Sequence, residues 1–392
     1  MNKATLLNFL SKVSVSGLGF ITVIITSKLF GAEGRGEISL FLTNVALIQL
    51  FCDFGNSSAN INLSYKYDNL NIWKTSAIWI IFVCLISIIP LYYLDVNMYV
   101  FVSLSAFLLS INNNNLLILM GNRQVNKRNL SLLAVAISLL ISVSIMYNLK
   151  YTIDKYYIFY IFTILLGIGF STSWVRQYLK NNEKFKFNKE VLKKGFLAQA
   201  GHFVQFLNYR LFFYFIVFYL GKFELGVFNN LIVLAESLWI IGHSIGQILH
   251  LKILNTENSQ LKIKLTNQSI VYSFIGTSLL FILLNTIPMN WWLFIFNKDF
   301  SEISILLPYL GLGVILFSIS NIINHYLHAM NEFKKIIWIN LVGLLAGVVT
   351  CLLLIEEMKL VGVCISWSIA FACSFILSVF FYSKKIKQAE IQ

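Results

Sequence analysis

Arg210 is a permanent cation in the middle of a long apolar segment, within the motif Asn208-Tyr209-Arg210. A guanidinium group stays charged in lipid and binds phosphate oxygens through paired hydrogen bonds. At 100° per residue, Gln199 and His202 fall on the same helical face as Arg210. This face predicts a binding site for an anionic ligand. The alternative is a structural ion pair between Arg210 and Glu236 in the next segment.

Lys12 is a second cation within an apolar segment, the first of the chain. Thr5, Asn8, Lys12 and Ser16 share one helical face, so Asn8 and Lys12 are further candidate ligand-binding residues. An ionisable group near the centre of a membrane helix costs about 2.5–3.5 kcal/mol and therefore indicates a cavity or a partner. The alternative for Lys12 is that its amine extends to the nearer membrane surface.

Glu236 and Asp53 are the acidic candidates within apolar segments, and either can pair with a cation or carry a coupling proton. Structural pairing is the favoured interpretation. His243 and His325 can titrate near neutral pH, although single helical histidines more often pack through hydrogen bonds. The nearest approach to metal-ligand spacing is His325 with His328, which is not convincing. No metal site and no cofactor are expected.

Four consecutive asparagines, Asn112 to Asn115, lie within another apolar segment. Four adjacent side chains cannot all face lipid, so some must line a wet cavity or bond across helices. Amides together with aromatic side chains are suited to holding sugars, which makes Asn112 a candidate substrate-binding residue. Hydrogen bonding between helices explains the same residues equally well.

The composition requires lipid as the solvent for these segments. Hydrophobic residues make up 58% of the 392 residues and charged residues only 12%, about half the charged share of a soluble domain. The sequence predicts an all-α, polytopic membrane protein of about 12 transmembrane helices. The spans lie near residues 5–29, 37–59, 74–94, 98–120, 128–149, 155–178, 195–220, 223–249, 266–288, 303–328, 334–354 and 360–382.

Most of the 30 Lys and Arg residues fall in the loops on one side of these spans. The positive-inside rule therefore places the N- and C-termini in the cytoplasm. This asymmetry accounts for the net charge of +13 without nucleic acid as a partner. The chain also lacks a phosphate-binding loop, a dinucleotide fingerprint and a nucleophile elbow, so no enzyme activity is expected.

A basic loop divides the spans six and six. The predicted domains are an N-terminal lobe (1–179), a cytoplasmic basic linker (180–194) and a C-terminal lobe with a short cytoplasmic tail (195–392). Gly31 and Gly36 after the first span align with Gly221 and Gly226 after the seventh, at one offset. Each pair is expected to close a tight turn that needs positive φ or close backbone approach. Two repeated six-helix lobes are a known transporter plan.

The stretch 207–250 has a pattern of Asn-Tyr-Arg, a Gly-x4-Gly turn and Leu-Ala-Glu-x-Leu-Trp. It resembles the seventh and eighth helices of O-antigen and capsular repeat-unit flippases (Wzx-type) of the MATE-like MOP exporter superfamily. The regions 29–36 and 296–308 and Gly362 are similar too. Many of these relatives have an acid two residues after the Arg, where this chain has Phe212. Glu236 is therefore the expected acidic neighbour of Arg210.

The resemblance implies two lobes around a central cavity and alternating access from either side of the bacterial cytoplasmic (inner) membrane. It implies a substrate of undecaprenyl diphosphate carrying one oligosaccharide repeat unit, with membrane lipids, a polysaccharide polymerase and a chain-length regulator as further partners. Two alternatives remain. One is a multidrug or cation antiporter of the same fold, although Lys12 stands where such carriers tend to have an acid. The other is a polysaccharide polymerase or ligase, which usually has a large external loop.

Overall fold

The computed structural model describes residues 3–391 apart from residues 58, 65, 95, 97 and 180–184. All regular secondary structure in this described part is helical. Nine of its helices are long and apolar enough to cross a membrane. Helices satisfy every backbone hydrogen bond within one segment, which lipid requires. The chain is thus an all-α, multi-pass membrane protein, as the composition predicts.

Two of the helices each contain two predicted spans. Helix α1 (Lys3–Cys52) has non-helical backbone at Gly31, and α12 (Phe333–Ile391) has it at Lys359. With these divisions and α7 (Lys189–Tyr219), each of the twelve predicted spans corresponds to a helix. The second span ends at Cys52 rather than near residue 59, because the chain turns at 53–57.

The chain forms two compact units. Unit 1 comprises Met1–Phe30 and Ile38–Ala200, and unit 2 comprises Gly31–Glu37 and Gly201–Gln392. The boundary between the two units falls inside α7. Of the predicted linker 180–194, residues 180–184 lie outside the described residues, and Lys189 already begins α7.

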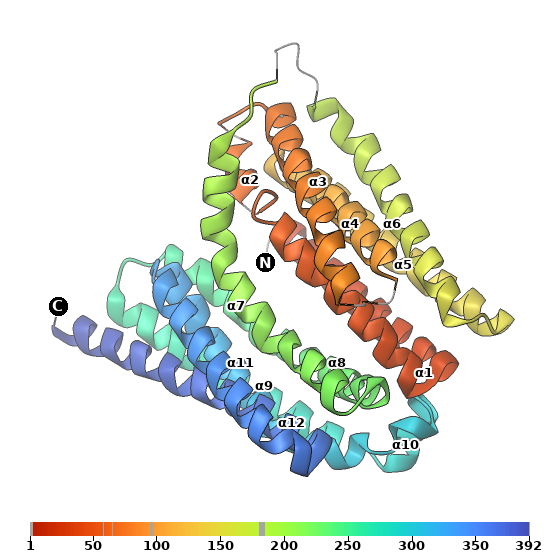
Figure 1. Ribbon diagram of the computed structural model, residues 1–392. Coiled ribbons are helices and arrows are strands. Elements are labelled where there is room, and N and C mark those ends of the chain that lie inside the picture. Colours follow the sequence, from red (N-terminus) through yellow and green to blue (C-terminus); the bar gives the residue numbers. More distant parts are fainter. Residues whose placement is uncertain are drawn as a thin grey trace. The chain divides into compact units, whose positions relative to one another are not determined.

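Unit 1 is a helical bundle in which α4 packs against α3, α5 and α6 (Figure 1). Its core joins apolar residues of α1 to these helices, among them Phe41, Ile80, Val102 and Tyr157. The helices are α2 (Ala59–Leu63), α3 (Asn69–Tyr93), α4 (Tyr99–Gly121), α5 (Val125–Leu149), α6 (Ile153–Val175) and η1 (Arg176–Tyr178).

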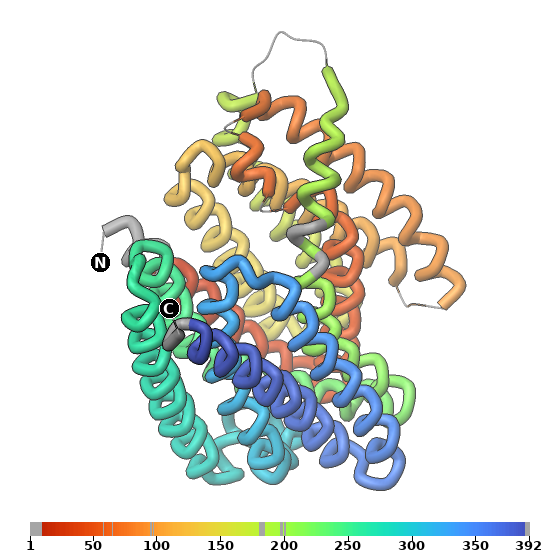
Figure 2. Tube along the Cα trace, turned by 90° about the vertical axis from the view of Figure 1, so that its left-hand side faces the viewer, coloured from red at the N-terminus to blue at the C-terminus, as the bar shows by residue number. Residues whose placement is uncertain are grey.

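Unit 2 is organised around α11, which packs against α8, α9 and α12 (Figure 2). Its helices after α7 are α8 (Lys222–Leu254), α9 (Ser259–Asn285), α10 (Met289–Ile295), η2 (Lys298–Phe300) and α11 (Ile303–Ala329), followed by α12. Trp291 and Trp292 are both in α10. Trp291 is 61% exposed, but Trp292 is buried and stacks on Phe296, so Trp292 is a core residue of unit 2.

The repeated glycines form a close crossing of helices within unit 2. Gly31 and Gly221 both have positive φ, at 67° and 108°, as the turn prediction requires. Gly36 and Gly226 face each other reciprocally. A Cβ on Gly36 would lie 1.8 Å from the carbonyl oxygen of Lys222, and a Cβ on Gly226 would lie 1.8 Å from that of Ala32. The crossing therefore requires hydrogen at both positions.

Polar contacts fasten the same crossing. The Asp299 carboxylate accepts a hydrogen bond from the Ala32 backbone N–H at 3.0 Å, where the second half of α1 begins. A carboxylate at a helix N-terminus satisfies an unpaired N–H and interacts favourably with the helix dipole. The Lys222 ammonium pairs with Glu37 at 3.2 Å. The segment 31–37 is thus held by side chains of unit 2.

Candidate functional site

Arg210 and Glu236 form an ion pair inside unit 2. The Arg210 guanidinium on α7 lies 3.0 Å from a carboxylate oxygen of Glu236 on α8, and it also stacks over the Phe213 ring at 4.9 Å. Their side chains are 26% and 34% exposed, so both groups are only partly buried. The structural ion pair considered from the sequence is present. Glu236 was the expected partner because this chain has Phe212 where many of the flippases that it resembles have an acid.

An aromatic cluster lies beside this pair. Tyr209, next to Arg210, contacts Trp239, Phe317 and Phe371 with ring centroids 5.5–5.9 Å apart. Trp239 stacks on Trp367 with an interplanar angle of 6°. These rings fix the register of α7, α8, α11 and α12 around the ion pair. The sequence shows the aromatic residues but not that they meet.

The residues predicted to share a face with Arg210 fall in different units. Gln199 is buried in unit 1, while His202 is exposed and belongs to unit 2 with Arg210. Within unit 2, His202 lies close enough to His328 on α11 to influence it electrostatically. All three lie on α7, and their common role in ligand binding stays a prediction.

Lys12 has a cationic neighbour that the sequence analysis did not select. Its side chain is exposed on α1, and Arg128, in the first turn of α5, is close enough to act on its charge. Arg128 also donates to Asn129 at 3.4 Å. The sequence places Arg128 at the very start of the predicted span 128–149, which gave no reason to pair it with Lys12. The side chain of Asn8 lies outside the described residues.

Asp53 lies in the turn after α1, where its carboxylate accepts a hydrogen bond from Asn113 at 3.3 Å. Three asparagines around this turn are fully buried: Asn56, Asn60 and Asn114. Each has an amide oxygen without a hydrogen-bond partner among the described residues. The turn is therefore polar and closely packed, and its one carboxylate is held by an amide donor.

The asparagine run bonds across the helices of unit 1. Asn112 accepts from the Ser171 hydroxyl at 2.8 Å, and Asn115 accepts from the Trp73 indole N–H at 2.8 Å. Asn115 also donates to Ser171 and Thr172 at 3.0 Å. The run thus joins α3, α4 and α6. Interhelical bonding, one of the two interpretations from the sequence, describes Asn112 and Asn115.

Replacing Asn115 with leucine should destabilise unit 1. The substitution leaves the part-buried Trp73 N–H without its acceptor, at about 1–3 kcal/mol, and removes the bonds that Asn115 donates to Ser171 and Thr172. Thermal unfolding in detergent measures the loss. Asn148→Leu, at an exposed site near the end of α5, is the matched control and should leave the midpoint near that of the wild type. Equal midpoints for the two variants would contradict the bonding role.

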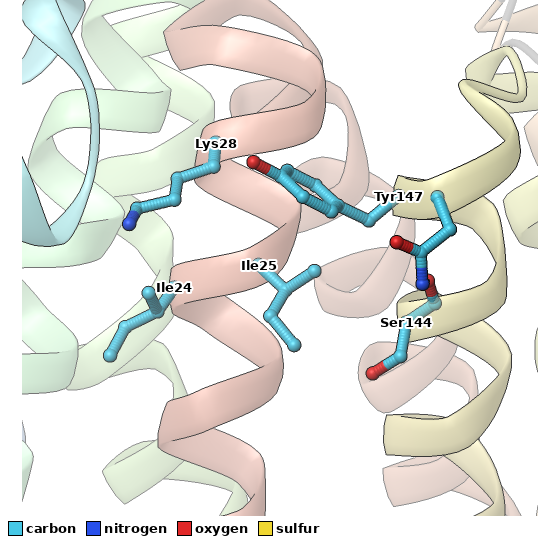
Figure 3. A pocket seen from close by; sticks show the side chains of 6 residues that line it. Ile24, Ile25, Lys28, Ser144 and Tyr147 are labelled. Atoms are coloured by element: carbon cyan, nitrogen blue, oxygen red, sulfur yellow. The ribbon is translucent and has the colours of Figure 1, made fainter.

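A cavity of about 340 Å³ lies between α1 and α5 in unit 1. Ile24, Ile25 and Lys28 line it from α1, and Ser144 and Tyr147 line it from α5 (Figure 3). The lining combines apolar and polar groups and contains a cation. No three His, Cys, Asp or Glu side chains in the described parts of the chain are placed to hold a metal ion.

Comparisons with known proteins give a structural likeness only. No family model matches the chain, and no curated protein sequence matches it. The chain is similar to an inward-facing multidrug resistance MATE family transporter of the MOP superfamily, with a TM-score of 0.78 and 14% identity. That match covers 96% of this chain and 95% of the transporter.

A second solved structure, the lipid II flippase MurJ in an inward closed conformation, is equally similar. Its TM-score is 0.80 at 16% identity, over 98% of this chain and 90% of MurJ. The chain has the fold of the MATE and MurJ transporters. An outward-facing MATE family transporter matches over 98% of this chain and 95% of its own, with a TM-score of 0.69 and 14% identity. This is the MATE-like architecture that the sequence resemblance implies.

Proposed function

We propose that this protein flips undecaprenyl-diphosphate-linked oligosaccharide repeat units across the bacterial inner membrane for surface-polysaccharide assembly. The observation that carries the proposal is Arg210, a partly exposed guanidinium within an apolar helix of unit 2, together with Lys12, a second cation within a membrane helix of unit 1. A positive charge in a low-dielectric setting is stabilised by an anion. A diphosphate headgroup supplies that anion.

The substrate class follows from what must cross the membrane. A diphosphate with sugars cannot cross bare hydrocarbon, so protein groups must replace its water shell. Lys12, Arg128 and Arg210 supply positive charge, while the polyprenyl tail can stay in lipid. MurJ, which shares the fold, is a lipid II flippase, and this supports a lipid-linked substrate. A polysaccharide polymerase and a chain-length regulator are the partners expected to use the product.

A multidrug or cation antiporter is the second candidate. Its support is the MATE likeness and the two acids within membrane helices or at their ends, Glu236 and Asp53. In such a carrier, an acid binds the cationic substrate and a nearby Lys or Arg weakens that binding. Glu236 already has Arg210 as its partner, which favours the anionic substrate.

Removing Lys12 and its cationic neighbour Arg128 should stop assembly of the surface glycan. In a strain that depends on this gene, Lys12→Ala and Arg128→Ala should each lower surface polysaccharide at least tenfold, and the double variant should abolish it. Lys155→Ala, an exposed lysine of unit 1, is the matched control and should leave the glycan unchanged. Normal glycan in the double variant, with altered drug susceptibility, would overturn the flippase proposal in favour of the antiporter.

A further inference from the structure

Six lysines gather at one end of unit 2, two from each of three helical segments. These segments are the first turns of α9, the first turn of α12 and the last turns of α12, and the residues are Lys262, Lys264, Lys334, Lys335, Lys384 and Lys385. The segments lie at the same end of the unit because α12 turns back on itself at its break (Figure 1). We call these six residues the lysine cluster. The ion pair, the aromatic cluster and the cavity described above do not include them.

Side-chain contacts hold the three segments of the lysine cluster together. Lys335 and Lys385 both pair with Oε1 of Glu332, in the turn between α11 and α12, at 3.1 and 2.5 Å. The Tyr382 hydroxyl donates to Oδ1 of Asn267 at 2.9 Å and so fastens the end of α12 to α9. Because two ammonium groups converge on one carboxylate oxygen, the cluster is a compact group of positive charges, and Glu332 offsets part of their mutual repulsion.

The positive charge of the lysine cluster exceeds the negative charge around it. Against the six lysines, the described residues of the three segments and of the turns that precede them include two acids, Glu257 and Glu332. The break in α12, at the other end of its two halves, shows the reverse, because Glu356 and Glu357 accompany Lys359. The basic excess therefore belongs to one end of these helices. The positive-inside rule predicts that this end faces the cytoplasm.

The lysine cluster lies where the apolar surface of the helices ends. Lys384 is one turn from Phe380, which is 48% exposed, and its ammonium lies over that ring at 4.3 Å from the centroid. Lys334 is one turn from Trp338, which is 59% exposed. In both cases the ring lies nearer to the middle of the helix and the lysine nearer to its end. This order is typical of the lipid headgroup level, where a ring meets acyl chains and an ammonium meets phosphate.

An acidic phospholipid matches both parts of this arrangement. Its phosphodiester carries the negative charge that a compact group of lysines attracts, and its acyl chains can lie along the exposed rings. A soluble anion would use the lysines but would gain nothing from Trp338 and Phe380. Each lysine at the surface of an acidic membrane strengthens the attraction by about 1 kcal/mol, which is about fivefold in affinity. Charge and depth together therefore favour a lipid as the ligand.

We propose that the lysine cluster is a binding site for acidic phospholipid headgroups, in which Lys334 and Lys384 contact the phosphates. Both side chains are exposed, whereas Lys335 and Lys385 are engaged with Glu332. Bound lipid bridges the first and last turns of α12 and holds this end of unit 2 at the membrane surface. The site does not depend on what the protein transports, since it uses neither of the cations assigned to the substrate.

Quenching of tryptophan fluorescence tests the site in the full-length protein in an uncharged detergent. Phosphatidylglycerol with brominated acyl chains is compared with phosphatidylcholine that has the same chains. The part of the quenching that is lost in a Trp338→Phe protein reports the lipid beside Lys334. At this position the acidic lipid should bind at least tenfold more tightly at low ionic strength, and its advantage should fall as salt is added.

Removing the two exposed lysines should remove the preference for the acidic lipid. Lys334→Gln/Lys384→Gln should lower the ratio of the two affinities at least fivefold. Lys334→Arg/Lys384→Arg keeps both charges and should retain the preference, which distinguishes a role of the charge from a general effect on folding. Lys155→Gln/Lys298→Gln removes two exposed lysines elsewhere in the chain and is the matched control, with the ratio expected to stay that of the wild type.

Three results would overturn the lipid site. These are equal affinities of the two lipids for the wild type, an unchanged ratio in Lys334→Gln/Lys384→Gln, and displacement of phosphatidylglycerol by inorganic phosphate. Phosphate should act no more strongly than sodium chloride at the same ionic strength, and specific displacement would indicate a site for the free anion. The glycan measurements that test the proposed function are separate, so either proposal can fail without the other.

Discussion

Replacing Arg210 with alanine should abolish surface-glycan assembly while the protein still inserts into the membrane. The Arg210 guanidinium can form two parallel hydrogen bonds to a phosphate, and it is partly exposed beside its acid. A lysine keeps the charge but not the planar fork, so Arg210→Lys should retain only partial function. Surface polysaccharide, measured together with the amount of protein in the membrane, checks both expectations.

The paired acid offers a way to separate a structural from a binding role of Arg210. Arg210→Ala leaves Glu236 without its cation in a partly buried place, which destabilises the protein for reasons unrelated to substrate. The double variant Arg210→Ala/Glu236→Ala removes both charges and should recover thermal stability but not the glycan. Recovery of the glycan in the double variant would show that Arg210 serves only to neutralise Glu236.

The sequence was sufficient for features that depend on one helix at a time. Twelve spans follow from apolar length, and positive φ at Gly31 and Gly221 follows from the repeated turns. The Arg210–Glu236 pair was foreseen because a membrane helix leaves a charge few choices of partner. The spans and the turns are local properties of the chain. The ion pair follows because charged residues within membrane helices are rare and tend to pair with one another.

The parts that the sequence did not predict depend on how helices are rotated against one another. Arg128 approaches Lys12, and the His325 ring of α11 packs against Gly246 of α8, only because particular faces of separate helices meet. A shift of one residue in either helix would turn its side chain by about 100° about the helix axis and move it away from its partner. The internal repeat aligned Gly36 with Gly226 but did not show that the two pack on each other.

Replacing Gly226 with alanine should destabilise the protein by about 3 kcal/mol or more, beyond the usual cost of overpacking. The added Cβ would meet the Ala32 carbonyl oxygen and the Gly36 amide, which are backbone atoms and cannot turn away as a side chain does. The two helices must therefore separate and weaken the neighbouring Lys222–Glu37 contact. Thermal unfolding in detergent and the amount of protein in the membrane measure the effect.

Gly169→Ala in α6 is the matched control, because nothing lies within 4 Å of its Cβ position. Alanine is favoured over glycine within a helix by about 0.8–1.0 kcal/mol, so this variant should be as stable as the wild type or slightly more stable. Both substitutions replace glycine with alanine, but Gly226→Ala should lower the stability of the protein whereas Gly169→Ala should leave it unchanged or raise it slightly. Gly36→Ala should repeat the loss, and the double variant Gly36→Ala/Gly226→Ala should cost less than the sum of the two because both disrupt one crossing. A Gly226→Ala protein as stable as Gly169→Ala would show that the helices can separate without loss.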